Sequence, residues 1–282
     1  MTKIKLSVEE KRSPGRESSP ACGDSSFLRI ESLSKSFRGL LALHNYHLNL
    51  TRGLIWGVIG PNGAGKTTLF NLVTGVLMPT SGRIIFQGHN ITGLPSHKIA
   101  RLGVARTFQN IRLFGPLSVL ENIKVGLQMH ERVGFLETVF SMPSFRGKEH
   151  RLEEEAYHLL KLFGLEPYCH APAGSLPFGH QRRLEVACAL ATHPQLLLLD
   201  EPTAGMNPSE TGEMMELISR IREEFGLTIM LIEHDMRVIM GVCDYIQTLN
   251  YGEIIAEGAP DEIQNNPRVI EAYLGGEVKL TA

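Results

Sequence analysis

A glycine-rich segment at residues 60–68 carries the residue types that could bind a phosphate group. Glycines let successive backbone N–H groups wrap a phosphate, and a helix that starts after them adds its positive end. Lys66 is long enough to reach the β- and γ-phosphates of a nucleotide, and the Thr67 hydroxyl can ligate Mg²⁺. The spacing therefore predicts a phosphate-binding loop, or P-loop, for a nucleoside triphosphate. The residues expected to contact it are Gly60, Pro61, Asn62, Gly63, Ala64, Gly65, Lys66, Thr67 and Thr68.

Two carboxylates, Asp200 and Glu201, directly follow a run of four leucines at residues 196–199. A carboxylate at the end of a core strand can hold Mg²⁺ through its water shell, so we expect Asp200 to lie beside the metal. One residue further on, Glu201 can orient and polarise the water that attacks the γ-phosphorus. The alternatives are an aspartate that only caps a strand and an exposed surface glutamate.

Positioning these groups requires strands that end at one edge of a sheet and helices that cover it. Short apolar runs and alternating patterns predict strands at residues 27–50, 54–59, 83–87, 196–199, 228–232, 244–249 and 253–256. Helical periodicity predicts helices after the P-loop and at residues 149–163, 181–192 and 208–225. The last of these has Asn207 as N-cap, Glu210 at N3 and Gly226 beyond its end. The alternation predicts a parallel sheet with helices on both faces, antiparallel strands at the N-terminal end and a helical insertion in the middle.

The composition excludes several classes of protein. Of 282 residues, 43% are hydrophobic and 21% charged, as in a globular protein with a sizeable core. Lys and Arg number 28 against 30 Asp and Glu, and this near-neutral charge gives no support to a nucleic-acid partner. No run approaches the roughly 18 apolar residues of a membrane span, and no secretory signal is present, so a membrane role must come through a partner.

The N-terminal residues and the cysteines carry little structural information. Residues 1–26 are rich in Ser, Pro, Gly, Lys and Glu and predict a disordered tail, because too little apolar surface can be buried to offset the entropy of ordering. The four cysteines are widely spaced and predict free thiols rather than a disulfide or zinc framework. They are Cys22, Cys169, Cys188 and Cys243.

Four further segments, together with the P-loop and the leucine-Asp-Glu segment, resemble motifs of the ATP-binding subunits of ABC transporters. Residues 106–109 (RTFQ) resemble the Q-loop, 176–183 (LPFGHQRR) the signature segment, 203–208 (TAGMNP) the D-loop and 232–235 (IEHD) the switch-histidine segment. All six occur in family order across about residues 27–257. The resemblance implies an α/β P-loop NTPase fold of the ABC nucleotide-binding type in residues 27–282. Its parts are a RecA-like parallel core sheet, an N-terminal antiparallel β subdomain, a helical signature subdomain at about 110–190 and a C-terminal extension at about 257–282.

The resemblance also implies roles for four more residues. Gln109 would touch the metal or the attacking water, and His234 would donate to the γ-phosphate. Phe37 stands where the family places an aromatic ring that stacks on adenine, and the N–H of Gly179 would suit a phosphate at the start of its helix. Without the resemblance, Gln109 could equally be an ordinary amide, His234 a structural histidine and Phe37 a core residue. These alternatives stay open.

Family members work as pairs, so the resemblance implies partners as well as cofactors. Two subunits sandwich two molecules of ATP, with Mg²⁺, head to tail, and the signature segment of each completes the site of the other. This chain carries one copy of each motif and would be one half of such a pair. ATP closes the dimer, and hydrolysis reopens it and moves the attached membrane subunits.

A finer resemblance links the chain to the ATPases of branched-chain amino acid importers. It is carried by residues 105–114, 116–123, 181–190, 231–244 and 257–277. It implies an identical or related second ATPase, two integral-membrane permease subunits and an extracytoplasmic solute-binding protein, with the chain at the cytoplasmic face of the inner or plasma membrane. The permease would dock on the stretch Asn110–Phe114 and the helices after it. Importers of neutral amino acids and of urea or short-chain amides share these features, so the solute stays open.

The signature segment departs from the family pattern at Pro177 and His180. Proline supplies neither a hydroxyl nor an N–H to a phosphate. We therefore expect the ATP site completed by this signature to be weaker than the site completed by its partner. Asn207 stands where many D-loops have aspartate, but asparagine is common in the branched-chain group.

Other classes of P-loop protein fit the sequence less well. A GTPase needs an Asn-Lys pair to read guanine, and the chain contains none. A small-molecule kinase leaves the signature and switch-histidine segments unexplained. The interval from Lys66 to Leu176 is too short for the coiled coils of DNA-repair ATPases, and translation factors of this family usually carry two cassettes. An exporter ATPase of the lipopolysaccharide type is the nearest competitor, and only the resemblance of residues 257–277 argues against it.

Overall fold

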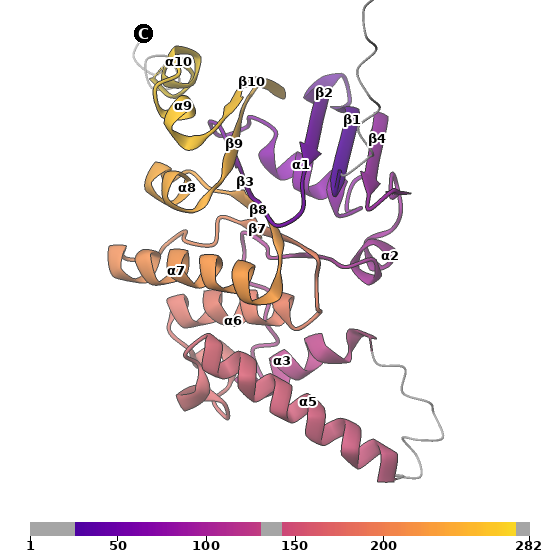
Figure 1. Cartoon of the computed structure of the whole chain (residues 1–282), viewed down its shortest axis with the longest axis vertical. Coiled ribbons are helices and arrows are strands. Elements are labelled where there is room, and N and C mark those ends of the chain that lie inside the picture. The colour runs from indigo at the N-terminus through magenta and orange to yellow at the C-terminus, as the bar shows by residue number, and fades with distance from the viewer. Residues whose placement is uncertain (1–25, 131–142, 275–282) are drawn as a thin grey trace, which may run out of the picture.

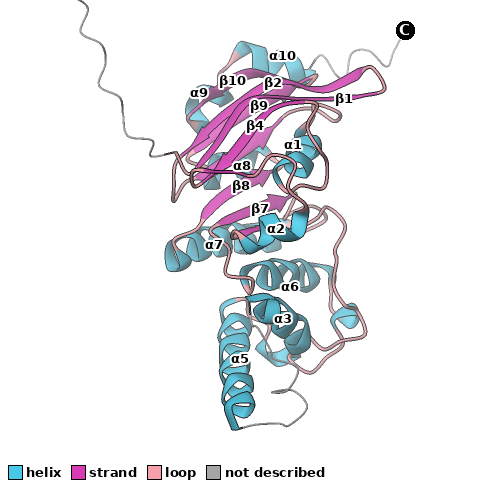
Figure 2. Cartoon of the chain, turned by 90° about the vertical axis from the view of Figure 1, so that its right-hand side faces the viewer, coloured by secondary structure: helices cyan, strands magenta, loops and turns pink. Residues whose placement is uncertain are grey.

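The computed structural model describes residues 26–130 and 143–274 of the 282. Nearly all of the predicted N-terminal tail, with Cys22 and the end of the expected C-terminal extension, lies outside the described residues. Figures 1 and 2 show two sheets at one end of the molecule and an arm of helices extending from the other.

The larger sheet supplies the strand ends at which the predicted site residues stand. Its strands are β3 (Ile55–Ile59), β6 (Val104–Arg106), β7 (Leu196–Asp200), β8 (Thr228–Ile232), β9 (Tyr245–Asn250) and β10 (Glu253–Gly258). They lie in the order β10-β9-β3-β8-β7-β6, and all neighbours are parallel except β9 and β10. Every residue of β3, β7 and β8 is buried, which explains their unbroken apolar sequences. The predicted parallel core sheet is confirmed.

Successive side chains of the central strands point into two different cores. In β7, Leu197 and Leu199 join one hydrophobic cluster, whereas Leu196 and Leu198 join the other. This alternation follows from the two-residue period of a strand. One cluster lies under the helices that follow β7 and β8. The other is shared with the helix after the P-loop and the smaller sheet, so that sheet covers part of the face for which we predicted only helices.

The smaller sheet is antiparallel, as predicted for the N-terminal end. Its strands are β1 (Leu28–Phe37), β2 (Leu40–Leu50), β4 (Ser81–Phe86) and β5 (His89–Asn90), in the order β2-β1-β4-β5. The alternating residues Tyr46, Leu48 and Leu50 of β2 are buried, and the residues between them are exposed. One face of this sheet therefore packs into the core, and the other faces solvent.

Helices cover the core sheet and form the C-terminal end. They are α1 (Lys66–Val73), α2 (Ser96–Arg101), α7 (Pro208–Phe225), α8 (Met236–Val242), α9 (Pro260–Gln264) and α10 (Pro267–Leu274). Helix α7 has the predicted capping box, in which Asn207 Oδ1 accepts from the N–H groups of Ser209 and Glu210, and it ends at Gly226 with φ of 60°. No helix was predicted at the position of α2, and only the structure shows it.

The helical arm lies between β6 and β7 in the chain. It consists of α3 (Val119–Leu127), α5 (Pro143–Leu162) and α6 (Phe178–Leu190), with short 3₁₀ turns at Gln128–His130, Glu166–Tyr168 and Ala173–Ser175. Figure 2 shows α3, α5 and α6 together below the core sheet. Helix α6 begins three residues before the predicted start at residue 181, and α5 begins at residue 143 rather than 149. Boundaries of this kind depend on the cap and not on the apolar period.

No helix in residues 26–130 or 143–274 combines the length and apolarity that crossing a bilayer requires. Cys169, Cys188 and Cys243 are free thiols, as expected.

Candidate nucleotide-binding site

The P-loop connects the end of β3 to the start of α1 and has a backbone that requires glycine. Gly60 and Gly65 have φ of 147° and 107°. A Cβ at Gly60 would lie 2.1 Å from the Leu249 carbonyl oxygen, and one at Gly65 would lie 2.6 Å from that of Ala42. These positions exclude any side chain, so the loop lies directly against β9 and β2. The predicted strand, loop and helix around Lys66 are confirmed.

The Lys66 ammonium lies folded back into its own loop. Its Nζ donates to the carbonyl oxygens of Gly60 at 2.6 Å and Pro61 at 3.1 Å. Burial lowers the pKa of Lys66 below its ordinary value, against the opposing effect of the Glu201 and Asp200 carboxylates. Carbonyl dipoles solvate the ammonium without neutralising it, so an incoming phosphate would be a stronger partner.

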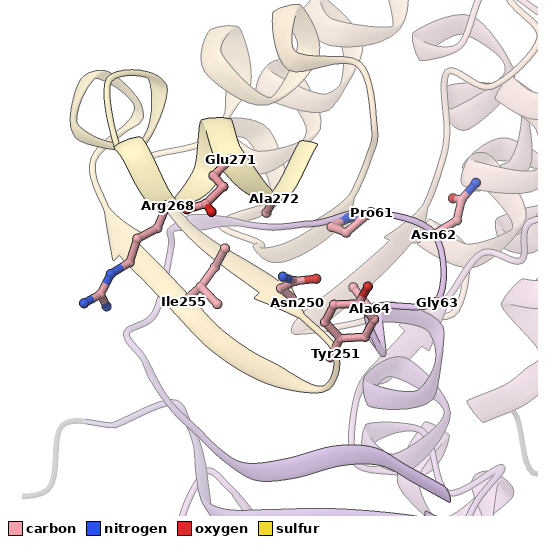
Figure 3. Close-up of a pocket in the computed structure, with 10 residues that line it drawn as sticks. All are labelled: Pro61, Asn62, Gly63, Ala64, Asn250, Tyr251, Ile255, Arg268, Glu271 and Ala272. Carbon is pink, nitrogen blue, oxygen red and sulfur yellow. The ribbon is translucent and has the colours of Figure 1, made fainter. Parts of the chain in front are cut away.

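The C-terminal extension touches the P-loop at a residue that sequence reasoning did not single out. The N–H of Gly60 donates to the Tyr273 hydroxyl on α10 at 2.9 Å. Figure 3 shows the neighbouring pocket of about 630 Å³, with P-loop residues on one side and Arg268 and Glu271 of α10 on the other. In the sequence, only the resemblance of residues 257–277 to the importer ATPases pointed to this segment. That resemblance assigned no role to Tyr273. The contact shows that α10 supports the first residue of the loop.

Asp200 stands at the end of β7 and is buried in an ion pair. Its Oδ2 lies 2.7 Å from Nη2 of Arg106, and both side chains are at least 95% buried. Arg106 Nη1 also donates to Asn71 Oδ1 on α1 at 2.7 Å, so one guanidinium joins β6, β7 and the helix of the P-loop. No group in the described residues donates to Asp200 Oδ1. Arg106 lies in the segment that resembles the Q-loop, where only Gln109 was predicted to have a role.

Glu201 has an unusual backbone and brings the other predicted catalytic groups together. Its φ is 51°, in the left-handed region that costs a non-glycine residue about 1–3 kcal/mol. The Glu201 N–H donates to the Ile232 carbonyl at 2.9 Å, which holds this conformation against β8. Its Oε2 accepts from Gln109 Nε2 at 3.3 Å and lies 3.9 Å from His234 Nδ1. The structure thus places Gln109, Glu201 and His234 within reach of one another.

A buried glutamate next to His234 supports this group and was missed from the sequence. Glu233 is fully buried, and its Oε1 accepts from the Thr203 N–H at 2.9 Å and from the Thr203 hydroxyl at 2.6 Å. Its Oε2 accepts from the His234 N–H at 3.2 Å. Glu233 therefore joins the ends of β7 and β8. The His234 side chain is 61% exposed and is not packed into the core.

Phe37 ends β1 and is 41% exposed, so the alternative that it is a core residue is wrong. Lys35 Nζ lies over the ring of Phe37, 5.0 Å from its centre, in a cation–π contact. This strand pairs with β2, whose Ala42 carbonyl lies against the P-loop. The position is compatible with an adenine-stacking role, which stays a prediction.

Gly179 is the second residue of α6, whose N-cap is Pro177. No acceptor in the described part of the chain bonds the N–H groups of Phe178, Gly179 and His180, as expected for an uncapped first turn. A Cβ on Gly179 would meet a Glu210 carboxylate oxygen at 2.8 Å, so the turn is also pressed against the start of α7. Figure 1 shows α6 in the arm, apart from α1, so the two predicted phosphate-binding ends of this chain do not meet.

The oxygen groups near the P-loop fit a magnesium ion. Thr67 is exposed, Asp200 keeps Oδ1 open, and Gln109 supplies an amide oxygen. Hydroxyl, carboxylate and amide oxygens are hard ligands of the kind that Mg²⁺ prefers. The chemistry of these donors fits the predicted metal ligands, whose roles remain predictions.

Two family models match the chain. A model described as "ABC transporter" matches residues 43–204, and one described as "Branched-chain amino acid ATP-binding cassette transporter" matches residues 253–279. The second covers the C-terminal end that packs against the P-loop.

Curated relatives match along almost their whole length. The chain is 46% identical over 248 residues to the high-affinity branched-chain amino acid transport ATP-binding protein BraF of Pseudomonas aeruginosa, covering 88% of this chain and 97% of BraF. It is 45% identical to LivG of Escherichia coli K12, with the same coverage. A probable LivG of Archaeoglobus fulgidus is 36% identical over 252 residues, covering 89% of this chain and 96% of that protein.

Solved structures with the same fold include an ATP-binding cassette in its ADP conformation and a dimeric cassette. The ADP conformation of MJ1267, an ATP-binding cassette of an ABC transporter, has a TM-score of 0.77 and 30% identity, covering 89% of this chain and 99% of that one. The dimeric structure of MJ0796, a bacterial ABC transporter cassette, has a TM-score of 0.72 and 25% identity, covering 83% and 98%.

Proposed function

The chain belongs to the branched-chain amino acid group of ABC transporter ATP-binding proteins, and from this premise we propose that it hydrolyses ATP to power the uptake of branched-chain amino acids. The single observation that carries the proposal is the meeting of Gln109, Glu201 and His234 beside a P-loop whose backbone admits only glycine at its two ends. The solute comes from the relatives' names, whereas the direction of transport rests on the resemblance to importer ATPases.

Hydrolysis requires a base that can take a proton from water next to the bound phosphates. Glu201 stands at the end of a fully buried strand, and its bond to Ile232 fixes the direction in which the carboxylate leaves the backbone. We assign it the role of orienting and polarising the attacking water. Gln109 holds Oε2 of the same carboxylate, and the exposed His234 is free to donate to the γ-phosphate.

Thr67, Asp200 and Gln109 would hold Mg²⁺ with the nucleotide. The ion would neutralise charge that develops on the phosphate oxygens during transfer. Arg106 occupies only Oδ2 of Asp200 and is anchored to α1, so it keeps the carboxylate in place while Oδ1 stays available. Lys66 would exchange its bonds to Gly60 and Pro61 for bonds to the β- and γ-phosphates.

The proposed working unit contains a second ATPase, identical or related, that completes the site. The unpaired N–H groups at the start of α6 lie apart from the chain's own P-loop, so their phosphate must come from another subunit. A relative of the same fold has a dimeric structure. Because Pro177 brings no hydroxyl to this end, we propose that the site completed by this signature is the weaker of the two.

The proposed permease contact lies at a groove between α2, β6 and α6. Its lining is largely apolar and includes Val76, Ile99, Ala105, Phe108 and Ala189, around a volume of about 230 Å³. Phe114, which follows the groove in the chain, is 57% exposed. An apolar surface beside the Q-loop would suit a helix from a permease subunit at the cytoplasmic face of the membrane. We therefore include Asn110–Phe114 in the proposed contact.

Purification of the native complex from membranes tests the partners and the solute together. We expect two permease subunits and a second ATPase to accompany the full chain. ATP should drive uptake of labelled leucine, isoleucine and valine into vesicles that hold the complex and a solute-binding protein. Uptake of urea or amides instead would assign a different solute to the same transport complex. An ATPase that co-purifies with no membrane subunit would overturn the transport proposal.

A further inference from the structure

An ion pair inside α6 is buried where nothing in the proposed function uses it. Arg182 Nη1 lies 2.9 Å from Glu185 Oε2, and the two side chains are 3% and 7% exposed. Their spacing of three residues places them on one face of the helix. A buried ion pair is costly to desolvate, so it persists only where further hydrogen bonds satisfy both groups. Their other partners are therefore informative.

Their other hydrogen-bond partners are backbone groups of the Q-loop, and the Arg182 guanidinium also lies 5.7 Å from the centre of the Phe178 ring. Arg182 Nη1 donates to the Phe108 carbonyl at 2.7 Å, and Nη2 donates to the carbonyl of Gln109. Glu185 Oε1 accepts from the Phe108 N–H at 3.2 Å. Three groups of the backbone at residues 108 and 109 are thus bonded to two side chains of one helix.

The backbone hydrogen bonds that join this segment to the core sheet end just before residue 108. The last backbone bond to β7 runs from the Thr107 N–H to the Leu198 carbonyl at 2.9 Å. Beyond it, Gln109 makes no backbone–backbone hydrogen bond within the described residues. Its side chain donates to Glu201, which directly follows β7 of the core sheet. The backbone of Gln109 is therefore held by the arm, whereas its side chain acts on the sheet.

We propose that Arg182 and Glu185 are positioning residues for ATP hydrolysis, which set the place of Gln109 relative to Glu201 by fastening its backbone to the signature helix. The proposal rests on the proposed function, because it assigns Gln109 a part in the reaction. A guanidinium presents its donors in a rigid plane, so Arg182 holds two consecutive carbonyls in a fixed orientation, whereas the donors of a lysine ammonium rotate on a flexible stem. The Q-loop and α6 then move as one body.

This fastening has a consequence for the pair of ATP sites. Helix α6 begins with the signature segment, which in the proposed dimer faces the nucleotide of the other subunit. The same helix holds Gln109, which serves the chain's own nucleotide. A shift of α6 on engaging one ATP would move Gln109 at the other.

A purely structural role would give a different result when the substitutions are combined. If the pair only docks the arm on the core, its loss lowers the stability of the arm but adds to the effect of any change at Gln109. If it acts through Gln109, its loss has little further effect once the Gln109 side chain is removed. A double-mutant cycle separates the two cases.

The experiment uses the full-length chain and the variants Arg182→Met, Gln109→Ala and their combination. We expect Arg182→Met to bind ATP as the parent does and to lower kcat between about tenfold and 100-fold, the range for a misplaced catalytic group. The double variant should be no slower than Gln109→Ala alone. Glu185→Gln, which keeps the acceptor for Phe108 but loses the charge, serves if Arg182→Met does not fold, and should lower kcat in the same direction.

Arg222→Met is the matched control, because Arg222 is an arginine on α7 that pairs with the partly exposed Asp244 carboxylate at 3.1 Å and lies outside the segments assigned to ATP. It should leave ATP binding and kcat unchanged. Parental kcat in Arg182→Met and in Glu185→Gln, or a double variant whose loss is the product of the two single losses, would overturn the proposal. Failure of the proposed function would look different, since the parent itself would then not hydrolyse ATP.

Discussion

The P-loop end and the signature end of the molecule hold their functional groups in opposite ways. At the P-loop end, Asp200 and Glu201 leave a strand that is buried at every position, and backbone ladders connect it to β8 and β6. At the signature end, α6 starts with a proline and an uncapped first turn. Its bonds to the Q-loop come from two side chains rather than from a backbone ladder.

The difference indicates which half does the chemistry and which half moves. Groups that must stay in register with water and phosphate stand on strand ends in a fully packed sheet. Groups that must approach a second subunit and withdraw again stand on an arm that is bonded to the Q-loop through side chains. The following predictions test this division, from the largest expected effect to the smallest.

Removing the Lys66 ammonium should have the largest effect. We expect Lys66→Ala to weaken ATP binding by on the order of 100-fold or more, because a charge-assisted contact to phosphate is worth about 1.5–3 kcal/mol and this side chain can make several. Isothermal titration with ATP measures the loss. Lys98→Ala on exposed α2 is the control and should bind as the parent does. Undiminished binding by Lys66→Ala would remove the P-loop from its assigned role.

Neutralising Glu201 should separate binding from hydrolysis. We expect Glu201→Gln to lower ATP turnover by about 10²–10⁴-fold, the usual contribution of a general base, while ATP binding stays intact. A closed dimer should accumulate with ATP and be visible by size-exclusion chromatography. Glu223→Gln on α7 is a matched surface control. Parental turnover would show that another group activates the water.

Breaking the ion pair of Asp200 should lower stability more than breaking a pair in the arm. We expect Arg106→Met to cost about 3–5 kcal/mol in the free energy of unfolding, because Asp200 is left charged and unpaired in the interior. Arg183→Met should cost about 0–1 kcal/mol, because the Glu213 carboxylate remains half exposed. Urea unfolding of both variants measures the difference. Equal losses would mean that burial does not make Asp200 depend on Arg106 more than Glu213 depends on Arg183.

Restoring a capping hydroxyl at the signature end should have a smaller and opposite effect. A serine N-cap stabilises the start of a helix by about 1 kcal/mol and adds a donor for phosphate. We therefore expect Pro177→Ser to raise ATP turnover of the assembled complex several-fold. The assay compares the variant complex with the parent at saturating ATP. No gain would mean that the proline does not weaken the site.

Removing residues 1–26 should have the smallest effect. These residues have too little apolar content to contribute to the core, so the shortened chain should keep its ATPase activity and its melting temperature. Steady-state hydrolysis and thermal unfolding of the two forms check this. Loss of activity would assign the predicted tail a structural role.

Much of the fold could be predicted because local patterns determine it. The unbroken apolar runs of β3, β7 and β8 require burial on both faces, and only glycine suits the loop between β3 and α1. The capping box at Asn207 and the glycine after α7 mark both ends of that helix. These features depend on residues that are neighbours along the chain, so the local sequence is enough to predict them.

The contacts inside the site could not be predicted in this way, because they depend on the order of the strands. Gln109, Glu201 and His234 follow β6, β7 and β8, which are adjacent only because the sheet runs in the order β3-β8-β7-β6. The bond from Gly60 to Tyr273 joins residues far apart in the sequence.

By itself, the sequence determined that a triphosphate loop, a pair of carboxylates and a signature helix are present, since each is a short pattern with its own physical signal. Only the tertiary structure decided that Arg106 holds Asp200 and that Arg182 and Glu185 hold the backbone of Gln109. A charged side chain carries no sign in the sequence of which buried group it will meet, because that partner is chosen when the sheet and the arm pack together.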